Sequence, residues 1–199
     1  MKVGVLALQG DVPEHRAAVA RVIPTSDVVT VRTPADLEEV DALTMPGGES
    51  TTIASLLEKS GLWDPLATRM REGLPVLATC AGLIVLATEL EAVPGGRNPR
   101  TFGVLPVSLR RNDYGPQIAS FEAPVHVAGI NGLFPGVFIR APRILSVGKE
   151  AEPVARRGRE IVGVQSRALV GLTFHPELTQ DPRVHAWFFR EVAGPAYRR

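Results

Sequence analysis

The sequence contains little cysteine, little lysine and no long hydrophobic run. Cys80 is the only cysteine among 199 residues, which excludes a disulfide within the chain and fits a reducing compartment. No apolar run approaches the ~20 residues that a membrane-crossing helix needs. The apolar stretch at the N-terminus has neither the length nor the cleavage site of a signal peptide. We therefore expect a cytoplasmic protein with no membrane partner.

The chain also lacks an excess of charge of one sign. Its formal net charge is +1 at pH 7, which gives no general electrostatic drive toward nucleic acid, so we expect no nucleic-acid partner. Hydrophobic residues make up 45% and charged residues 22%, as in a globular protein with a substantial core. Because there are no repeats, low-complexity stretches or linkers, residues 1–199 are expected to form a single domain.

The first half of the chain alternates short apolar runs with segments of helical spacing. We expect strands at residues 2–8, 27–32, 41–45 and 74–79, and helices at residues 12–22, 34–40, 52–60 and 62–71. Strands that alternate with helices at short intervals are typical of parallel βαβ units. The pattern predicts an α/β fold with a mostly parallel central sheet and helices on both of its faces.

The second half changes character after a loop at residues 93–100. Short β-like runs follow at residues 104–111, 123–127, 137–140, 144–147 and 154–156. They predict antiparallel strands that are added at an edge or as a flap. The last strands, at residues 161–165 and 169–174, are close enough to form a hairpin, and residues 181–192 predict a closing amphipathic helix.

Cys80 lies at a predicted junction between a strand and a helix. Two small residues, Ala81 and Gly82, follow it and precede an apolar segment, Leu83–Leu90, of helical length. This is the thiol version of a nucleophile elbow, in which small neighbours allow a tight turn and the helix N-terminus favours the thiolate. A buried structural cysteine explains the same stretch equally well. The stretch alone leaves both interpretations open.

Two further strand ends carry unusual residues. His175 and Glu177 directly follow an apolar run, and such a pair suits a general base and the carboxylate that orients it. The paired glycines Gly47 and Gly48 lie between a strand and a helix, where backbone N–H groups can face an oxyanion. All three places are at the carboxyl ends of predicted strands, where open α/β sheets bind their ligands.

The remaining histidines serve as a comparison. We expect His15 to be a surface or capping residue and His126 to face solvent, and a structural or surface role is favoured for His185 as well. No histidine or cysteine cluster has zinc spacing, and His175 with Glu177 offers too few ligands, so no metal is expected.

Four further side chains, at residues 49, 50, 111 and 140, have polar groups that suit contacts with a small substrate. Glu49 and Ser50 also suit the N-terminal cap of a helix, and both roles are compatible. Arg111 and Arg140 suit a substrate carboxylate. From the residues alone, a solvated surface position explains each arginine as well.

Taken together, the motifs resemble the class I, or triad, glutamine amidotransferases. The nucleophile segment 79–84 and the His-Pro-Glu segment 174–179 alone would indicate that class. The segments 46–52 (Pro-Gly-Gly-Glu-Ser-Thr-Thr) and 138–142 (Phe-Ile-Arg-Ala-Pro) narrow the resemblance to the glutaminase subunit of two-component pyridoxal 5'-phosphate synthases. The likeness covers nearly the whole length, including segments 8–15, 111–112 and 120–123. It implies a three-layer, flavodoxin-like fold.

The resemblance also implies a mechanism. Cys80 attacks the side-chain amide of L-glutamine, His175 activates the water that releases glutamate, and Glu177 orients His175. The oxyanion hole would be formed by N–H groups of Ala81 and of the Gly47–Gly48 loop. The positions that match glutamine-binding residues of the family are Gly48, Glu49, Ser50, Arg111, Ile139 and Arg140. No cofactor is implied, because pyridoxal 5'-phosphate is the product of the complex.

The family further implies a (β/α)8-barrel partner in a large hetero-oligomer. Ammonia would pass through an internal channel to this partner. The glutaminase would have almost no activity until docking of the partner fixes the conformation of the oxyanion loop. Gln9 and Gly10 would lie near that contact. One departure is Ala78, where the family usually has glycine, and we expect a slightly more crowded elbow.

Two other classes of function remain as alternatives. A stand-alone thiol hydrolase, such as a γ-glutamyl hydrolase, would use the same nucleophile without a partner. A regulatory subunit that keeps only the fold is disfavoured, because every candidate triad residue is present.

Overall fold

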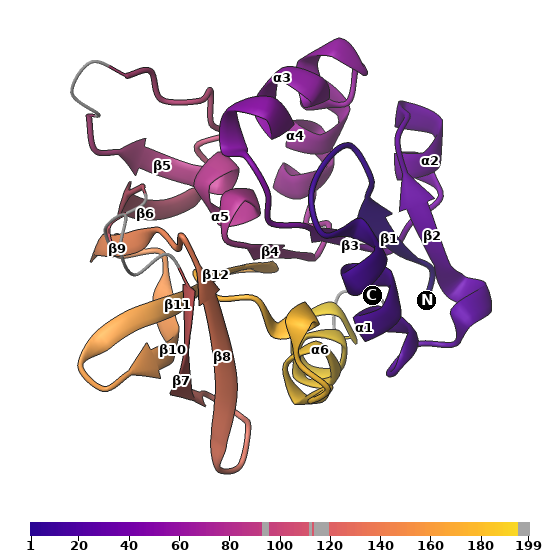
Figure 1. The fold of residues 1–199 in the computed structure, drawn as a ribbon. Helices are drawn as coiled ribbons and strands as arrows, with labels where there is room; N and C mark the ends of the chain where they lie inside the picture. The colour runs from indigo at the N-terminus through magenta and orange to yellow at the C-terminus, as the bar shows by residue number, and fades with distance from the viewer. Residues whose placement is uncertain (93–95, 112, 114–119, 195–199) are drawn as a thin grey trace.

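A nine-stranded mixed sheet forms the centre of the molecule (Figure 1). The computed structural model describes residues 1–92, 96–111, 113 and 120–194. Residues 93–95 of the expected loop 93–100, Asn112 of the 111–112 segment and residues 195–199 of the expected tail 194–199 lie outside these ranges. The strand order in the large sheet is β2-β1-β3-β4-β12-β11-β10-β7-β8.

Five neighbouring strands of this sheet run parallel, as the sequence predicts. They are β2 (Val28–Val31), β1 (Val3–Leu6), β3 (Ala42–Met45), β4 (Val76–Thr79) and β12 (Leu169–Leu172). Every residue of β1, β3, β4 and β12 is buried, because helices cover both faces of a parallel sheet. This explains why these strands are continuous apolar runs in the sequence.

The other four strands extend the sheet by antiparallel pairing. They are β11 (Glu160–Ser166), β10 (Glu152–Arg157), β7 (Ser120–Val127) and β8 (Leu133–Ile139). In β8, buried and more exposed residues alternate along the strand, as expected for a sheet with one solvated face. The predicted hairpin of the last two strands is confirmed by the antiparallel pairing of β11 with β12.

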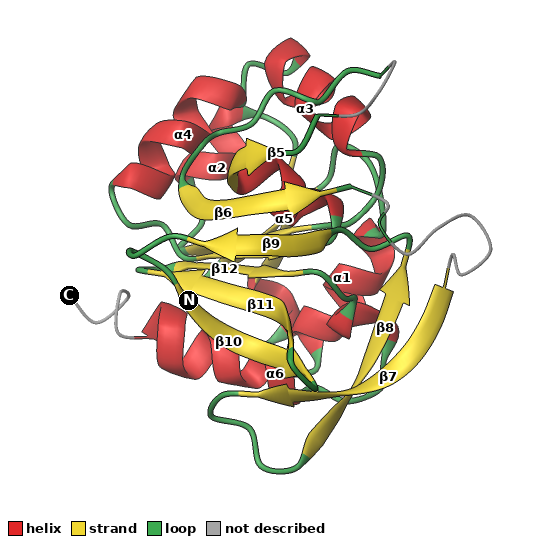
Figure 2. Ribbon diagram, turned by 90° about the vertical axis from the view of Figure 1, so that its left-hand side faces the viewer, coloured by secondary structure: helices red, strands yellow, loops and turns green. Residues whose placement is uncertain are grey.

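A second sheet of three strands lies beside β11 and β12 (Figure 2). It consists of β5 (Ala87–Leu90), β6 (Leu105–Arg110) and β9 (Arg143–Val147). The prediction of a helix through residue 90 is therefore wrong, because α5 (Ala81–Leu86) ends before Ala87. Pairing of β5 with β6, together with a 3.0 Å hydrogen bond from Thr88 Oγ1 to the Val107 carbonyl, outweighs the local helical spacing.

Helices cover the two faces of the large sheet (Figure 1). On one face lie α2 (Pro34–Glu38), α3 (Ser50–Lys59), α4 (Trp63–Arg71) and α5. On the other lie α1 (Val12–Ala20), α6 (Arg183–Trp187) and the π-helical segment η3 (Phe188–Ala193). Two short 3-10 turns, η1 (Thr25–Asp27) and η2 (Pro176–Leu178), complete the described elements.

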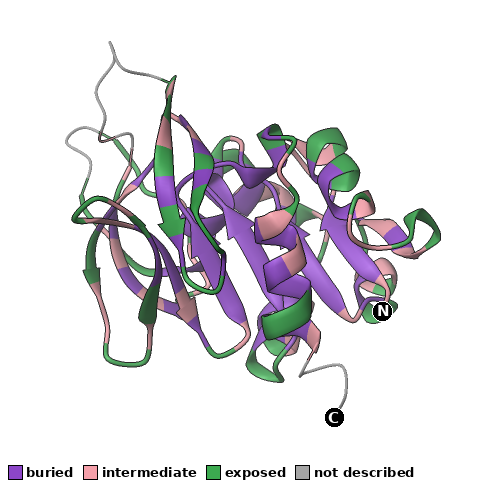
Figure 3. Cartoon of the chain, turned by 90° about the horizontal axis from the view of Figure 1, so that it is seen from below, coloured by how far each residue is buried: buried purple, intermediate pink, exposed green. Residues whose placement is uncertain are grey.

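Two hydrophobic cores result, one on each face. Successive residues of a strand point to opposite cores: Leu77 packs into one, while Val76 and Ala78 pack into the other. Buried residues consequently fill the strands at the centre of the molecule (Figure 3). None of the described helices combines the length and the apolar character that would let it cross a membrane.

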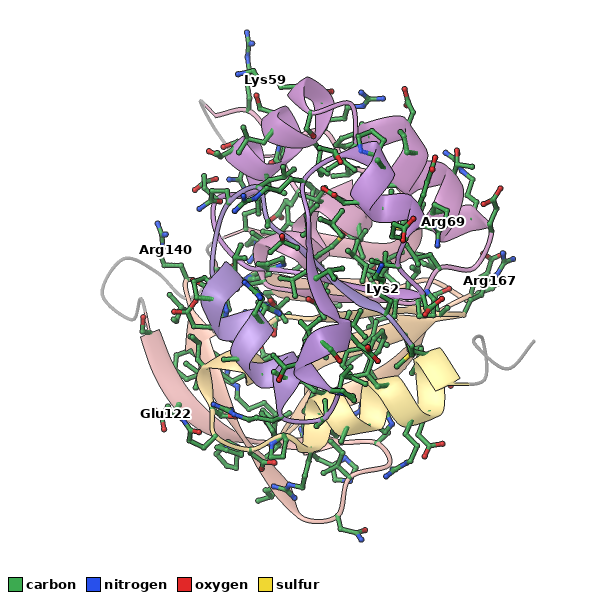
Figure 4. The ribbon with its side chains drawn as sticks, turned by 90° about the vertical axis from the view of Figure 1, so that its right-hand side faces the viewer. Lys2, Lys59, Arg69, Glu122, Arg140 and Arg167 are labelled. Atoms are coloured by element: carbon green, nitrogen blue, oxygen red, sulfur yellow. The ribbon has the colours of Figure 1, made fainter. Side chains whose placement is uncertain are left out.

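The parallel strands place their carboxyl ends at one edge of the sheet. Lys2 and Arg167, which precede β1 and β12, lie at the opposite edge from Arg140 (Figure 4). The segments that follow β1, β3, β4 and β12 therefore meet at the same edge as Arg140. These are the segments in which the sequence places the candidate site.

Candidate active site

Cys80 occupies a sharp turn between β4 and α5. Its backbone has φ 47° and ψ −103°, a conformation that residues other than glycine rarely adopt. Such strain is typical of a nucleophile elbow, which holds the side chain out of the strand–helix junction. The adjoining helix packs closely, because a Cβ on Gly82 would lie only 2.6 Å from the carbonyl oxygen of Met45. The predicted elbow and its need for small residues are thus present in the structure.

His175 and Glu177 form a tight buried pair after β12. The distance between His175 Nδ1 and Glu177 Oε1 is 2.6 Å, and the side chains are 3% and 0% exposed. The backbone N–H of His175 donates to the carbonyl of Val137, which anchors the segment to β8. Burial alone would lower the pKa of His175, but interactions with Cys80 and Glu177 raise it to about 10.

Cys80 and His175 line the same pocket. His175 Nε2 is buried and has no hydrogen-bond partner within the described part of the chain, yet Cys80 is close enough to raise the pKa of the ring. Nucleophile–base contacts are commonly longer in free enzymes than in substrate complexes. Cys80 is buried, with 7% of the residue exposed, and its Sγ lies 3.7 Å from the carbonyl oxygen of Ile139. The three predicted triad residues therefore lie together, because His175 contacts Glu177 and shares a pocket with Cys80.

Glu177 is held by more than His175. Its Oε1 lies 3.3 Å from His15 Nε2 and 3.5 Å from Thr79 Oγ1. Although burial raises the pKa of Glu177, His15 and His175 outweigh it and lower the pKa well below the ordinary value. Glu177 is therefore an ionised carboxylate.

The expectation of a surface or capping role for His15 is wrong. His15 is fully buried because α1 packs against η2, and its Nε2 contacts Thr79 at the end of β4. His185 is also fully buried, and burial lowers its pKa to about 4, so its ring is neutral near pH 7. His126 is exposed on β7, as predicted.

The glycine loop after β3 lies directly against the triad. A Cβ on Gly47 would overlap the His175 ring, so only glycine allows this approach. Ala81 is the first residue of α5, and its N–H has no acceptor within the helix. These positions are compatible with the predicted oxyanion hole.

A pocket of about 120 Å³ opens above Cys80 and His175. Every residue that the sequence assigned to substrate binding lines it: Gly48, Glu49, Ser50, Arg111, Ile139 and Arg140. Two further lining residues, Asp11 and Ile84, were not predicted. Asp11 follows the end of β1, so its position at a strand end was the signal that could have identified it.

Arg111 and Glu49 form an ion pair in the pocket, and Arg140 lies at its rim. Arg111 donates to Glu49 Oε1 at 3.2 Å, and Glu49 also caps α3 by accepting from the Thr51 N–H and hydroxyl groups. The cap and the pocket position of Glu49 thus coexist. Arg140 is exposed at the rim with a positive φ of 41°, and its side chain points away from the body of the molecule (Figure 4).

Asp11 adds a further titratable group beside the triad. Its Oδ2 lies 3.5 Å from His175 Nδ1, and burial raises the pKa of this half-buried carboxyl. Ligand atoms of Asp11, His175 and Glu177 all lie within 4.8 Å of one another, the spacing of a metal site. His175 Nδ1 is already engaged with Glu177, which leaves it poorly suited to a metal. The absence of a metal remains a prediction.

The comparison with known families decides the assignment. Residues 5–194 match the model of the SNO glutamine amidotransferase family. The chain belongs to this family. A relative from Thermococcus gammatolerans, called pyridoxal 5'-phosphate synthase subunit PdxT, is 47% identical over 96% of this chain and 99% of its own. A relative of the same name from Pyrococcus horikoshii is 46% identical over 96% of this chain and 100% of its own. The resemblance seen in the sequence is confirmed.

Solved structures agree with this assignment. A crystal structure described as a glutamine amidotransferase superimposes with a TM-score of 0.88 at 45% identity, covering 98% of this chain and 100% of that chain. PurLQS from Thermotoga maritima gives a TM-score of 0.66 at 14% identity, covering 100% and 99%, and so shares the fold. The predicted fold class is confirmed.

Proposed function

We propose that the chain hydrolyses L-glutamine to L-glutamate and ammonia as the glutaminase subunit of a pyridoxal 5'-phosphate synthase, with residues 1–199 acting as one amidotransferase domain. The observation that carries the proposal is the placement of Cys80, on a strained elbow and beside the His175–Glu177 pair, in a pocket of small-molecule size. The family and the names of the relatives support the same reaction.

Cys80, His175 and Glu177 share the covalent chemistry of the proposed reaction. Cys80 Sγ attacks the side-chain amide carbon of glutamine, and His175 Nε2 takes the thiol proton. His175 then protonates the leaving nitrogen, so that ammonia departs and a glutamyl thioester remains. A water molecule, deprotonated by His175, attacks the thioester, glutamate leaves and the thiol is restored. Glu177 holds the ring and stabilises the imidazolium in both steps.

Backbone groups supply the charge stabilisation. The tetrahedral intermediate of each step carries a negative oxygen, which preorganised N–H donors can stabilise. We assign this role to the N–H of Ala81 and to the Gly47–Gly48 loop, and the close approach of Gly47 to the His175 ring supports the assignment. Ala81 lies at the start of α5, where the helix dipole also favours negative charge.

Charged residues of the pocket match the two charged groups of free glutamine. Arg111 and Arg140 suit the α-carboxylate, and the Glu49 carboxylate suits the α-ammonium. Gly48, Ser50 and Ile139 complete the walls around the amide. No step in this sequence needs a cofactor or a metal of the chain.

The partner in this proposal is a (β/α)8-barrel synthase subunit. In large hetero-oligomers of the two chains, ammonia would pass to the barrel without release. The contacts of Gln9 and Gly10 with the glycine loop support a link between docking and the oxyanion hole. Gln9 Oε1 accepts from the Glu49 N–H at 2.8 Å, and Gly10 packs against the Gly47 carbonyl.

A glutamate-release assay tests the proposal. The purified chain is given glutamine with and without the barrel subunit, and we expect strong turnover only when both are present. Cys80→Ala should abolish it, because the chain has no second thiol. Strong activity of the chain alone would favour a stand-alone hydrolase, and no activity of the pair would overturn the proposal.

A further inference from the structure

His15 lies in direct contact with the carboxylate of the triad although it belongs to a different part of the chain. It projects from α1, and its side chain is 0% exposed. Its Nε2 lies 3.1 Å from Thr79 Oγ1 and 3.3 Å from Glu177 Oε1. Thr79 directly precedes the nucleophile. One imidazole therefore touches both the strand that carries Cys80 and the segment that carries His175.

The contacts fix which nitrogen of His15 carries a proton. Nε2 faces the ionised carboxylate of Glu177, which only accepts hydrogen bonds, so Nε2 must be the donor. Nδ1 is buried without a hydrogen-bond partner in the described chain, where a second N–H would be costly. His15 is thus best described as the neutral Nε2–H tautomer, whose proton lies between Thr79 Oγ1 at 3.1 Å and Glu177 Oε1 at 3.3 Å.

All the described hydrogen bonds of the Glu177 carboxylate converge on one oxygen. Oε1 receives His175 Nδ1 at 2.6 Å, together with the contacts to His15 and Thr79. Oε2 is buried with no partner in the described part of the chain. Because nothing described holds Oε2, the orientation of the carboxylate depends on the donors around Oε1. His15 and His175 are the two ring donors among them.

We propose that His15 is a positioning residue of the triad, whose Nε2–H holds the Glu177 carboxylate in the orientation that fixes His175 against Cys80. This rests on the proposed function, in which His175 is the base. A hydrogen bond from His15 is among the causes that lower the pKa of Glu177 against burial, which agrees with the geometry. His15 acts through Glu177 and touches no reacting atom.

His185 offers a matched control in the same cluster. It is fully buried on α6, and its ring packs edge-on to His15 with 6.4 Å between centroids. Neither of its ring nitrogens has a hydrogen-bond partner within residues 1–92, 96–111, 113 and 120–194. Replacing His15 or His185 by leucine changes the side-chain volume by the same amount at two neighbouring buried positions, but only the former removes a donor beside Glu177.

Three variants of His15 separate the effect of losing the hydrogen-bond donor from the effect of changing the side-chain volume. His15→Leu removes the donor. His15→Gln keeps a donor at the same number of bonds from Cα as Nε2, and His15→Asn keeps an amide that is one bond too short. The first readout is the rate at which iodoacetamide alkylates the full chain at pH 7, which reports Cys80 alone because no other cysteine exists. The second is kcat and KM for glutamine in the complex with the barrel subunit.

We expect His15→Leu and His15→Asn to lower both the alkylation rate and kcat by about tenfold, with KM within twofold. His15→Gln should recover most of each loss, and His185→Leu should match the wild type. Wild-type rates in a folded His15→Leu, or in His15→Asn should the leucine variant not fold, would overturn the proposal. If the wild-type complex does not turn over glutamine, the proposed function fails, and the alkylation rates still decide the role of His15.

Discussion

At the scale of single residues, the site depends on side chains whose roles differ in how visible they are in the sequence. Cys80, His175 and Glu177 occur in compact motifs at strand ends, so the triad is predictable from the sequence alone. His15 lies within the helix predicted at residues 12–22, outside any motif at a strand end. The available signal was its place on the apolar face of the helix at residues 12–22, where an imidazole lies among buried positions. That spacing predicts burial, but only the packing of α1 on η2 reveals Glu177 as its partner.

The carboxylate of the triad should be less essential than the residues it serves. We predict that Glu177→Gln keeps a kcat at least roughly tenfold higher than that of Cys80→Ala or His175→Ala. The reason is that orienting the base contributes less to catalysis than the base itself. The measurement is glutamate release by each variant with the barrel subunit, with thermal unfolding as the check on folding. An equal or larger loss in Glu177→Gln would contradict this order.

At the scale of elements, the loop after β1 and the loop after β3 are in close contact. Gln9 accepts from the Glu49 N–H, and Gly10, at φ 103°, lies so close to Gly47 that a Cβ would overlap its carbonyl oxygen. The sequence places both loops at one sheet edge. It cannot predict this contact, because the distance between two loops depends on the packing of the helices that follow them.

This contact predicts a large effect of a single methyl group. Gly10→Ala should lower kcat by about tenfold or more, because the new Cβ must displace the Gly47–Gly48 loop that we assign to the oxyanion hole. Gly73 is the matched control, since it has the same φ of 103° but nothing within 4 Å of an added Cβ. Both variants carry the backbone strain of about 1 kcal/mol or more that alanine has at positive φ.

Glutamate release and thermal unfolding distinguish the two glycines. Gly73→Ala should lose stability through strain alone and keep its kcat, whereas Gly10→Ala should lose both. If the two variants have the same kcat, the contact between the loops does not support the oxyanion hole. The strain itself cancels between the two variants, because both carry it.

At the scale of the whole molecule, the parallel half of the sheet was predictable and its continuation was less so. Buried parallel strands leave continuous apolar runs, and each was found within a few residues of its bounds. The strand β5 was missed because its apolar residues suit a helix equally well, and only pairing with β6 decides between them. The alternating strands were recognised, but their division between two sheets depends on contacts far apart in the sequence.

The buried titratable groups predict how the free energy of unfolding depends on pH. His185 has a pKa of about 4 in the folded chain, mainly through burial, and about 6.5 when unfolded. The unfolded chain therefore binds a proton first, and stability falls as the pH falls from about 6.5 to 4. His175 is the reverse case: its folded pKa of about 10 gives a stabilisation that is complete below about 6.5 and is lost as the pH rises through 10. Stability should be greatest near pH 6.5.

His185→Leu isolates the acid side of this profile. In urea unfolding at pH 7 and pH 4, the wild type should lose more stability than the variant, by about 3 kcal/mol at full effect, because leucine cannot take up the proton. Protonation of carboxylates, including Glu177 with its lowered pKa, also destabilises the folded chain in acid. These carboxylates are common to both proteins, so their effect cancels in the difference. Equal losses in the two proteins would mean that His185 is protonated in the folded state, and hence that the α1–α6 core admits a charge beside His15.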